Sequence, residues 1–266
     1  MKKIEMKIST CIDMMFSRHD FDERIAAAQS AGINTVEFWK WTNKDVDSIA
    51  HELRELNMRL SVFNIDCKDE KLSYDLSRGI LNAGRKEELL AALKESAHVY
   101  KKLGACGMIV LIGETIEGIS REEQKENIFD CLEYVRDYVE REEITLVVEP
   151  LNAADRVNYF MPEADELMEI LHRVNSPRIK MLYDIYHQHM TGDFSVNFIK
   201  ENLDFIGHFH VADCPGRHEP GTGDVNYISI IGEILKLGYD KYIGLEYRAT
   251  RPDEETFGFL KEIKNA

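Results

Sequence analysis

The sequence predicts an α/β protein folded as a (β/α)8 TIM barrel. Short apolar runs rich in β-branched residues alternate with longer amphipathic segments along the whole 266-residue chain. Apolar runs that alternate with helices are typical of parallel strands buried on both faces. Eight such strand–helix units in about 250 residues match a TIM barrel. Because no Ser- or Gly-rich linker divides the chain, we expect one domain over residues 1–266.

The elements follow from this alternation, taken in order. The expected strands cover residues 7–12, 34–39, 60–64, 108–112, 145–149, 179–184, 205–211 and 242–246. The expected helices cover residues 21–31, 44–56, 86–103, 121–142, 163–173, 195–202, 227–237 and 254–263. Gly32 and Gly104 end two of these helices, as glycine commonly does.

The alternative architecture is a doubly wound open sheet. That fold usually carries a Gly-rich turn after its first strand, and no GxGxxG follows residues 7–12. The longest expected loop spans residues 65–85. A loop of that length either covers the barrel mouth or is a surface excursion without a role.

The composition limits the classes of molecule that the protein is expected to bind. The chain is 44% hydrophobic and has a formal net charge of −15, with a pI near 5.1. Binding of nucleic acid depends on clustered Lys and Arg, and this charge repels phosphates. We therefore expect a small-molecule substrate and no nucleic-acid partner.

Two further features bear on location. No apolar run approaches the roughly 18 residues that span a bilayer, and residues 1–7 lack the apolar block of a signal peptide. The five cysteines are scattered and odd in number. A reduced, cytoplasmic protein without a membrane partner is expected, with Cys214 a weak candidate for reactivity.

Ionisable residues stand at the ends of the last four strands. They are Glu149, Asp184, His210 and Glu246. In a TIM barrel the carboxyl ends of the strands form the active site. Four such groups in one layer repel or stay unsatisfied unless a cation neutralises them, so a divalent metal site is predicted; a structural polar ring is the alternative. Three carboxylates and one imidazole suit Mn²⁺, Mg²⁺ or Co²⁺, and Zn²⁺ is compatible.

Nearby polar residues complete a candidate substrate site. His187 begins the loop after the sixth strand, and Asp155 follows Glu149 in the preceding loop. Arg217 lies in a turn-rich loop, where its planar fork suits a carboxylate or a pair of hydroxyls. His208 shares strand parity with His210 and is expected to be a hydrogen-bonded core residue one layer deeper.

Four motifs then resemble a known family. They are residues 149–152 (Glu-Pro-Leu-Asn), 183–187 (Tyr-Asp-Ile-Tyr-His), 207–213 (Gly-His-Phe-His-Val-Ala-Asp) and 215–223 (Pro-Gly-Arg-His-Glu-Pro-Gly-Thr-Gly). Together they resemble the xylose-isomerase-like TIM barrels, with the hydroxypyruvate isomerase family as the nearest match. The resemblance covers the whole chain, but its specific motifs lie in the second half.

The resemblance implies roles for these residues. Glu149, Asp184, His210 and Glu246 would bind the metal, and Glu149 and Glu246 would also be the acid/base pair. The resemblance to ketose 3-epimerases implies that His187 and Arg217 bind substrate. Asp155 stands where those epimerases tend to have Glu, and His210 stands where hydroxypyruvate isomerases often have Gln.

The implied activity is isomerisation of a small hydroxy-oxo acid, of the hydroxypyruvate or 2-oxo-tetronate type. One glutamate would take a proton from carbon and the other would return it, through an enediolate that the metal stabilises. The alternatives are a ketose 3-epimerase for free sugars, an abasic-site DNA endonuclease and a non-catalytic sugar-binding barrel. A homodimer or homotetramer is expected by analogy with related barrels.

Overall fold

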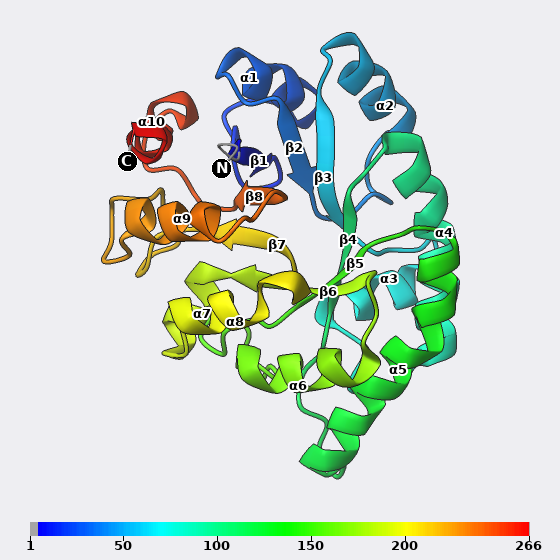
Figure 1. Cartoon of the computed structure of the whole chain (residues 1–266). Helices are drawn as coiled ribbons and strands as arrows, with labels where there is room; N and C mark the ends of the chain where they lie inside the picture. Colours follow the sequence, from blue (N-terminus) through cyan, green and yellow to red (C-terminus); the bar gives the residue numbers. More distant parts are fainter. Residues whose placement is uncertain (1–4, 266) are drawn as a thin grey trace.

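The computed structural model describes residues 5–265 and contains a closed barrel of eight parallel strands, numbered around the barrel in chain order (Figure 1). The strands are β1 (Lys7–Cys11), β2 (Thr35–Phe38), β3 (Arg59–Asn64), β4 (Gly107–Leu111), β5 (Leu146–Glu149), β6 (Ile179–Asp184), β7 (Ile206–Val211) and β8 (Tyr242–Leu245). The pairing of β1 with β8 closes the sheet, so the (β/α)8 prediction is confirmed and the open-sheet alternative is wrong.

Helices surround the barrel on its outer side (Figure 1). They are α1 (Arg24–Ser30), α2 (Val46–Glu55), α3 (Glu70–Arg78), α4 (Lys86–Leu103), α5 (Arg121–Arg141), α6 (Ala164–Val174), α7 (Ile185–Thr191), α8 (Val196–Asn202), α9 (Tyr227–Lys236) and α10 (Gly258–Asn265). Short 3₁₀ turns precede α1, β7 and α10, at Phe21–Glu23, Leu203–Phe205 and Asp253–Glu255. Eight of the helices match expected ones, while α3 and α7 were not foreseen.

The segment 65–85, expected to be a loop, contains α3. The Asp69 carboxylate accepts a hydrogen bond from Leu72 N at 2.8 Å and caps the helix. The residues after α3 pack closely against the end of β4. Gly79 lies so near to that backbone that an added Cβ would be 2.3 Å from Gly113 N. Leu81 N donates to Ile112 O at 2.8 Å. The segment therefore packs against the barrel mouth, which agrees with the first of the two placements expected from the sequence.

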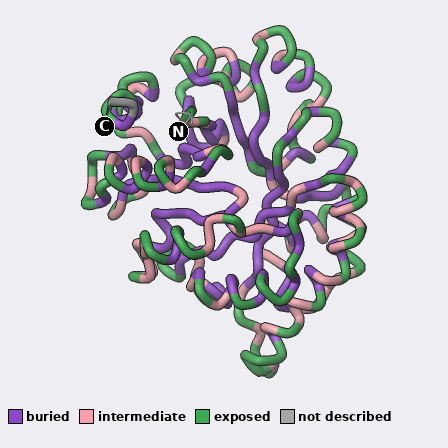
Figure 2. Tube along the Cα trace, in the orientation of Figure 1, coloured by how far each residue is buried: buried purple, intermediate pink, exposed green. Residues whose placement is uncertain are grey.

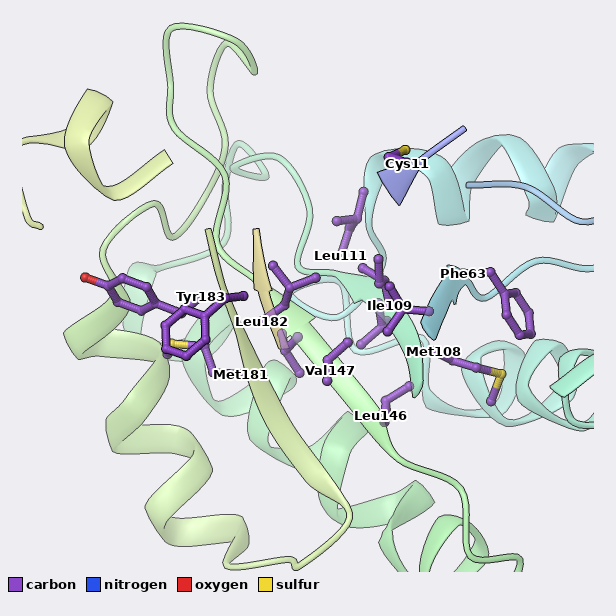
Figure 3. Close-up of a cluster of buried hydrophobic side chains, with 14 of the residues drawn as sticks. Cys11, Phe63, Met108, Ile109, Leu111, Leu146, Val147, Met181, Leu182 and Tyr183 are labelled. Carbon is purple, nitrogen blue, oxygen red and sulfur yellow. The ribbon is translucent and has the colours of Figure 1, made fainter. Parts of the chain in front are cut away.

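Side chains alternate between the barrel interior and the helix layer. The strands are almost wholly buried, and the exposed surface lies on the helices and loops (Figure 2). Leu182 points toward Val147 and the barrel interior, whereas Tyr183 projects from the other face of β6 (Figure 3). Outside the barrel, the Tyr183 ring stacks on Phe198 of α8 at 5.5 Å between centroids. This parity directs Asp184, two residues after Leu182, into the barrel mouth.

A tyrosine ties two strand ends together at the mouth. The buried hydroxyl of Tyr159 accepts a hydrogen bond from Ile112 N at 2.9 Å and donates to Glu149 O at 2.8 Å. Ile112 follows β4 and Glu149 ends β5. The backbone position of Glu149 is thereby held by a side chain from the next loop.

Two observations concern the expected setting of the protein. Among the described residues, no helix is both long and apolar enough to cross a membrane. All five cysteines are free thiols, and Cys11, Cys67 and Cys131 are buried. Burial raises the pKa of the Cys214 thiol, which disfavours the nucleophilic thiolate form.

We predict that Tyr159→Phe destabilises the barrel. The change leaves a buried N–H at Ile112 and a buried carbonyl at Glu149 without their partner, which costs roughly 2 kcal/mol or more in unfolding free energy. Urea denaturation followed by circular dichroism measures it. Tyr134→Phe is the control, because Tyr134 is 45% exposed. Equal stability of both variants would show that the two hydrogen bonds contribute nothing.

Candidate metal and active site

The four strand-end residues converge in the folded chain. Glu149 ends β5, Asp184 ends β6, His210 lies in β7 opposite Asp184, and Glu246 follows β8. One oxygen or nitrogen from each lies within 4.8 Å of the corresponding atoms of the others, and all four residues are buried. The predicted grouping of these side chains is therefore present.

The donor atoms fit a divalent metal. His210 Nδ1 lies 3.4 Å from Glu149 Oε1 and 3.5 Å from Glu246 Oε2. Within residues 5–265, neither His210 Nδ1 nor Glu149 Oε1 has a hydrogen-bond partner, although both are buried. Buried polar atoms without partners are rare. Three carboxylates and one imidazole nitrogen directed at one point could hold Mn²⁺ or Mg²⁺, and also Co²⁺ or Zn²⁺.

The second nitrogen of His210 faces a carboxylate that sequence reasoning missed. His210 Nε2 lies 3.0 Å from Oε1 of Glu37, which comes from β2. The other oxygen of Glu37 accepts hydrogen bonds from Ser9 Oγ at 2.7 Å and Ser61 Oγ at 2.8 Å, and lies 3.1 Å from His208 Nε2. The predicted core role of His208 is confirmed. A signal for Glu37 existed, because it is the one charged residue inside a strand predicted to be buried on both faces.

Gly244 makes room for this contact. A Cβ at Gly244 would lie 2.5 Å from Glu37 Oε1 and 2.7 Å from His210 Cδ2. Any larger residue in this part of β8 would separate the carboxylate from the imidazole. The Glu37–His210 pair thus depends on a glycine two residues before Glu246.

The pKa shifts of Glu37 and His210 agree with their close contact. Burial by itself raises the pKa of Glu37, but His210 and His208 outweigh it and hold that pKa far below its usual range. Burial disfavours a charged His210, yet Glu246 and Glu37 outweigh it and raise the pKa of the imidazole. The raised pKa favours the charged imidazole, which would offset the negative charge of the surrounding carboxylates.

The two glutamates of the site differ in their surroundings. Burial raises the pKa of Glu149, against the opposing contact with His210. Burial would also raise the pKa of Glu246, but His210 and Arg217 outweigh it and lower the value. Trp39 Nε1 donates to Glu246 Oε1 at 2.8 Å, and Arg217 Nη2 donates to Glu246 Oε2. These surroundings thus favour the protonated form more at Glu149 than at Glu246.

The two carboxylate oxygens of Asp184 have different roles: one caps a helix and the other faces the site. Oδ1 accepts from Tyr186 N at 2.8 Å and from His187 N at 3.3 Å, which caps the N-terminus of α7. Oδ2 lies 4.0 Å from Arg217 Nη2. Burial raises the pKa of Asp184 to about 7, and Arg217 opposes that rise. The cap fixes the carboxyl plane so that Oδ2 remains for a ligand.

His187 lies in α7, not in a loop as expected, because Asp184 starts a helix at once. Its Nδ1 accepts a hydrogen bond from Asn152 N at 3.1 Å, which places the proton of the neutral ring on Nε2. Burial, with Arg217 and His210, lowers the pKa of His187 well below its usual value. Its Nε2 is buried and, among the described residues, has no hydrogen-bond partner. His187 therefore presents an N–H donor to the site, where Nε2 lies 3.5 Å from Asp184 Oδ2.

Arg217 and Asp155 meet on the other side of the mouth. Arg217 Nη1 donates to Asp155 Oδ2 at 3.4 Å, and the Arg217 guanidinium lies over the Tyr186 ring at 5.2 Å. Tyr186 OH donates to Asp155 Oδ1 at 3.3 Å. The guanidinium charge is thus largely balanced by Glu246 and Asp155.

Asp213 organises the loop that carries Arg217. Its carboxylate accepts hydrogen bonds from the backbone N–H groups of Cys214, Gly221, Thr222 and Val225, at 2.6–3.1 Å. Four donors on one buried carboxylate hold both ends of the loop together. Arg217 itself has φ +56°, in the left-handed region that few non-glycine residues adopt. Sequence reasoning did not assign this role to Asp213.

A cavity of about 320 Å³ opens above these groups. Glu149, Glu246, His187, Arg217 and Asp155 all line it. Its apolar wall is formed by Trp39, Ile65, Ile109, Leu111 and Leu151. The size suits a small polyhydroxy compound.

Comparison with known proteins agrees with this architecture. The family described as Xylose isomerase-like TIM barrel matches residues 25–263. Hydroxypyruvate isomerase from Escherichia coli is 29% identical, with 91% of this chain and 93% of that protein covered. 2-Oxo-tetronate isomerase from Cupriavidus necator is 27% identical, with 94% of this chain and 95% of that protein covered.

Solved structures are similar over nearly the whole chain. One, described as AP endonuclease, family 2, from Brucella melitensis, has a TM-score of 0.86 and 28% identity, covering 97% of this chain and 98% of that one. L-ribulose 3-epimerase has a TM-score of 0.72 and 17% identity, covering 97% of this chain and 86% of that one. At that identity the second likeness shows the fold alone.

We predict opposite effects for two Gly→Ala changes. Gly244→Ala forces Glu37 and His210 apart and lowers the unfolding free energy by about 1–3 kcal/mol. Gly232→Ala is the control: it lies in α9 with nothing within 4 Å of an added Cβ, and it gains up to about 1 kcal/mol of helix propensity. Urea denaturation of both variants measures the difference. A Gly244→Ala protein as stable as the parent would contradict the close packing.

Proposed function

The chain belongs to the xylose isomerase-like TIM barrel family, and we propose that it is a metal-dependent isomerase of a small hydroxy-oxo acid, of the hydroxypyruvate or 2-oxo-tetronate type. The isomerase class itself is supported by homologues over more than nine-tenths of the chain. The observation that carries the finer proposal is the grouping of Glu149, Asp184, His210 and Glu246 beside one cavity, with both glutamates lining it.

The proposed metal ligands are these four residues. A divalent ion bound there would polarise a carbonyl oxygen of the substrate and an adjacent hydroxyl, which would acidify the hydrogen on the hydroxyl-bearing carbon. Support comes from the unpartnered atoms His210 Nδ1 and Glu149 Oε1. Mn²⁺ or Mg²⁺ is favoured by the three carboxylates.

Glu149 and Glu246 are the proposed proton carriers. An isomerisation of this type removes a proton from one carbon and delivers a proton to its neighbour, so one carboxylate must accept while a carboxylic acid donates. The opposite directions of their pKa shifts support this division. Trp39 and Arg217 hold Glu246 in place from two sides.

The proposed substrate contacts are His187, Arg217 and Asp155. The Nε2–H of His187 suits a carbonyl or hydroxyl oxygen, and Asp155 can accept from a hydroxyl. Arg217 Nε is buried and, within the described chain, unpartnered, so it retains a donor. These groups orient oxygen atoms; they transfer no proton in this proposal.

An epimerase acting on free ketoses is the second candidate. His210 favours it, because the resemblance pairs His at this position with ketose 3-epimerases. The same two-glutamate arrangement would serve, with the proton returned to the same carbon on the opposite face. The two activities differ in whether the substrate carries a carboxylate.

Substrate exchange with D₂O tests the proposal. With Mn²⁺ present, we expect the wild type to interconvert hydroxypyruvate or 2-oxo-tetronate with its isomer and to incorporate deuterium at the exchanging carbon, seen by NMR. Glu149→Gln and Glu246→Gln should each lower the rate at least 10²-fold, and EDTA should abolish it. Glu122→Gln on the surface of α5 is the control.

The outcomes of this assay separate the candidates. Turnover of neutral ketoses alone would sink the acid isomerase and support the epimerase. Nicking of abasic DNA without turnover of any sugar or oxo acid would favour a nuclease, which the net charge of −15 argues against.

We also predict that Glu37→Gln weakens metal binding. The carboxylate opposite His210 Nε2 orients the ring and strengthens Nδ1 as a donor, and loss of such a partner typically costs 10–100-fold in metal affinity. Isothermal titration of the metal-free protein with Mn²⁺ measures it, with Glu122→Gln as the matched control. An unchanged Kd in a folded Glu37→Gln protein would contradict this role.

A further inference from the structure

Four acids and four bases line the cavity, but two of the bases are not paired with an acid among the residues that the structure describes. Its basic lining residues are Lys40, Lys44, Arg156 and Arg217. Lys44 lies 3.1 Å from Asp13, and Arg217 is bonded to two acids. Among the side chains that the structure describes, no carboxylate lies within ion-pair distance of Lys40 or Arg156, which bond only to neutral oxygens.

One helix holds both cations. Lys40 Nζ donates to Ser73 Oγ at 2.9 Å and to Ser73 O at 3.2 Å. Arg156 Nη2 donates to Ser77 O at 2.9 Å. Ser73 and Ser77 are one turn apart on α3, so they lie on the same face of that helix. The two side chains, which come from the loops after β2 and β5, are thereby brought to one wall of the cavity.

Both cations retain donors for a ligand. An ammonium has three N–H groups and a guanidinium has five, and the bonds to α3 use only some of them. Ser77 itself lines the cavity beside them. Arg156 and His187 line the same cavity, and the charge of Arg156 helps to lower the pKa of His187.

We propose that Lys40 and Arg156, held on α3, form an anion subsite that binds the carboxylate of the substrate. This inference rests on the proposed function and deepens it, because it names the feature that selects an acid over a neutral sugar. Arg217 is a poorer candidate for this carboxylate, since Glu246 and Asp155 already balance its charge. A neutral ketose would leave both cations without a counter-charge.

A structural role is the competing explanation. Cations that bond to carbonyls in the last turns of a helix also stabilise that helix. Such a role would lower the melting temperature of a variant but would affect acid and neutral substrates equally. The test therefore compares substrates as well as stabilities.

The experiment measures KM and kcat for Lys40→Gln, Arg156→Gln and the double variant, in Mn²⁺, with hydroxypyruvate or 2-oxo-tetronate and with a neutral ketose. We expect each single change to raise KM for the acid about tenfold or more, with a larger effect in the double variant. KM for a neutral ketose that is turned over should stay within about twofold. Arg156→Lys should recover part of the affinity, and Lys236→Gln on α9 is the control.

Binding of tartronate, a hydroxy acid that cannot isomerise, separates this inference from the proposed function. If no acid is turned over but tartronate binds the Mn²⁺-loaded wild type at least tenfold more tightly than the double variant, the subsite stands and the isomerase proposal fails. If acids are turned over with unchanged KM in the double variant, the subsite is wrong and the isomerase stands. Loss of stability alone, with equal changes for both substrate types, would assign the two residues to helix capping.

Discussion

Burial of charge at the barrel mouth is the constraint on which the rest of the site depends. Carboxylates removed from water are tolerated only when opposite charge or hydrogen-bond donors surround them. His210 meets that need from both ring nitrogens, with Glu149 and Glu246 near one and Glu37 near the other. The glycine at position 244 permits this contact, because a larger side chain would occupy the same space. A larger residue at this position of β8 would therefore disturb the balance of charges in the whole site.

Backbone hydrogen bonds provide the rigidity that this charge arrangement requires. The Tyr159 hydroxyl fixes the backbone of Glu149, the α7 cap fixes one oxygen of Asp184, and the carboxylate of Asp213 gathers the loop that carries Arg217. Each of these contacts involves a main-chain group near a site residue rather than the cavity itself. Among the described residues, some side chains at the site keep buried atoms without a hydrogen-bond partner, such as Nε2 of His187, because neighbouring groups satisfy the structural bonds.

In the proposed function, proton transfer and recognition of the substrate carboxylate involve different groups of residues around one cavity. The proposed proton carriers line the cavity, and the other proposed metal ligands lie buried beside them, where burial and neighbouring charges shift the pKa values. The cations without acidic partners, Lys40 and Arg156, lie on the wall formed by α3. Among barrels of one fold, such walls provide a physical basis for substrate differences, because loops vary while the strand ends carry the chemistry.

The sequence by itself determined the barrel, its eight strands and the convergence of Glu149, Asp184, His210 and Glu246. Apolar runs that alternate with amphipathic segments are a local pattern, and parallel strands bring their carboxyl ends to one edge. Only the tertiary structure decided that Glu37 approaches His210, because closure of the barrel sets contacts across it. Packing likewise decided that residues 70–78 form a helix: that stretch is mostly polar, with Leu72 and Leu76 as its main apolar residues. Contacts between distant segments have no local signature. The hydrogen bonds that Lys40 and Arg156 both donate to α3 could therefore be seen only in the folded chain.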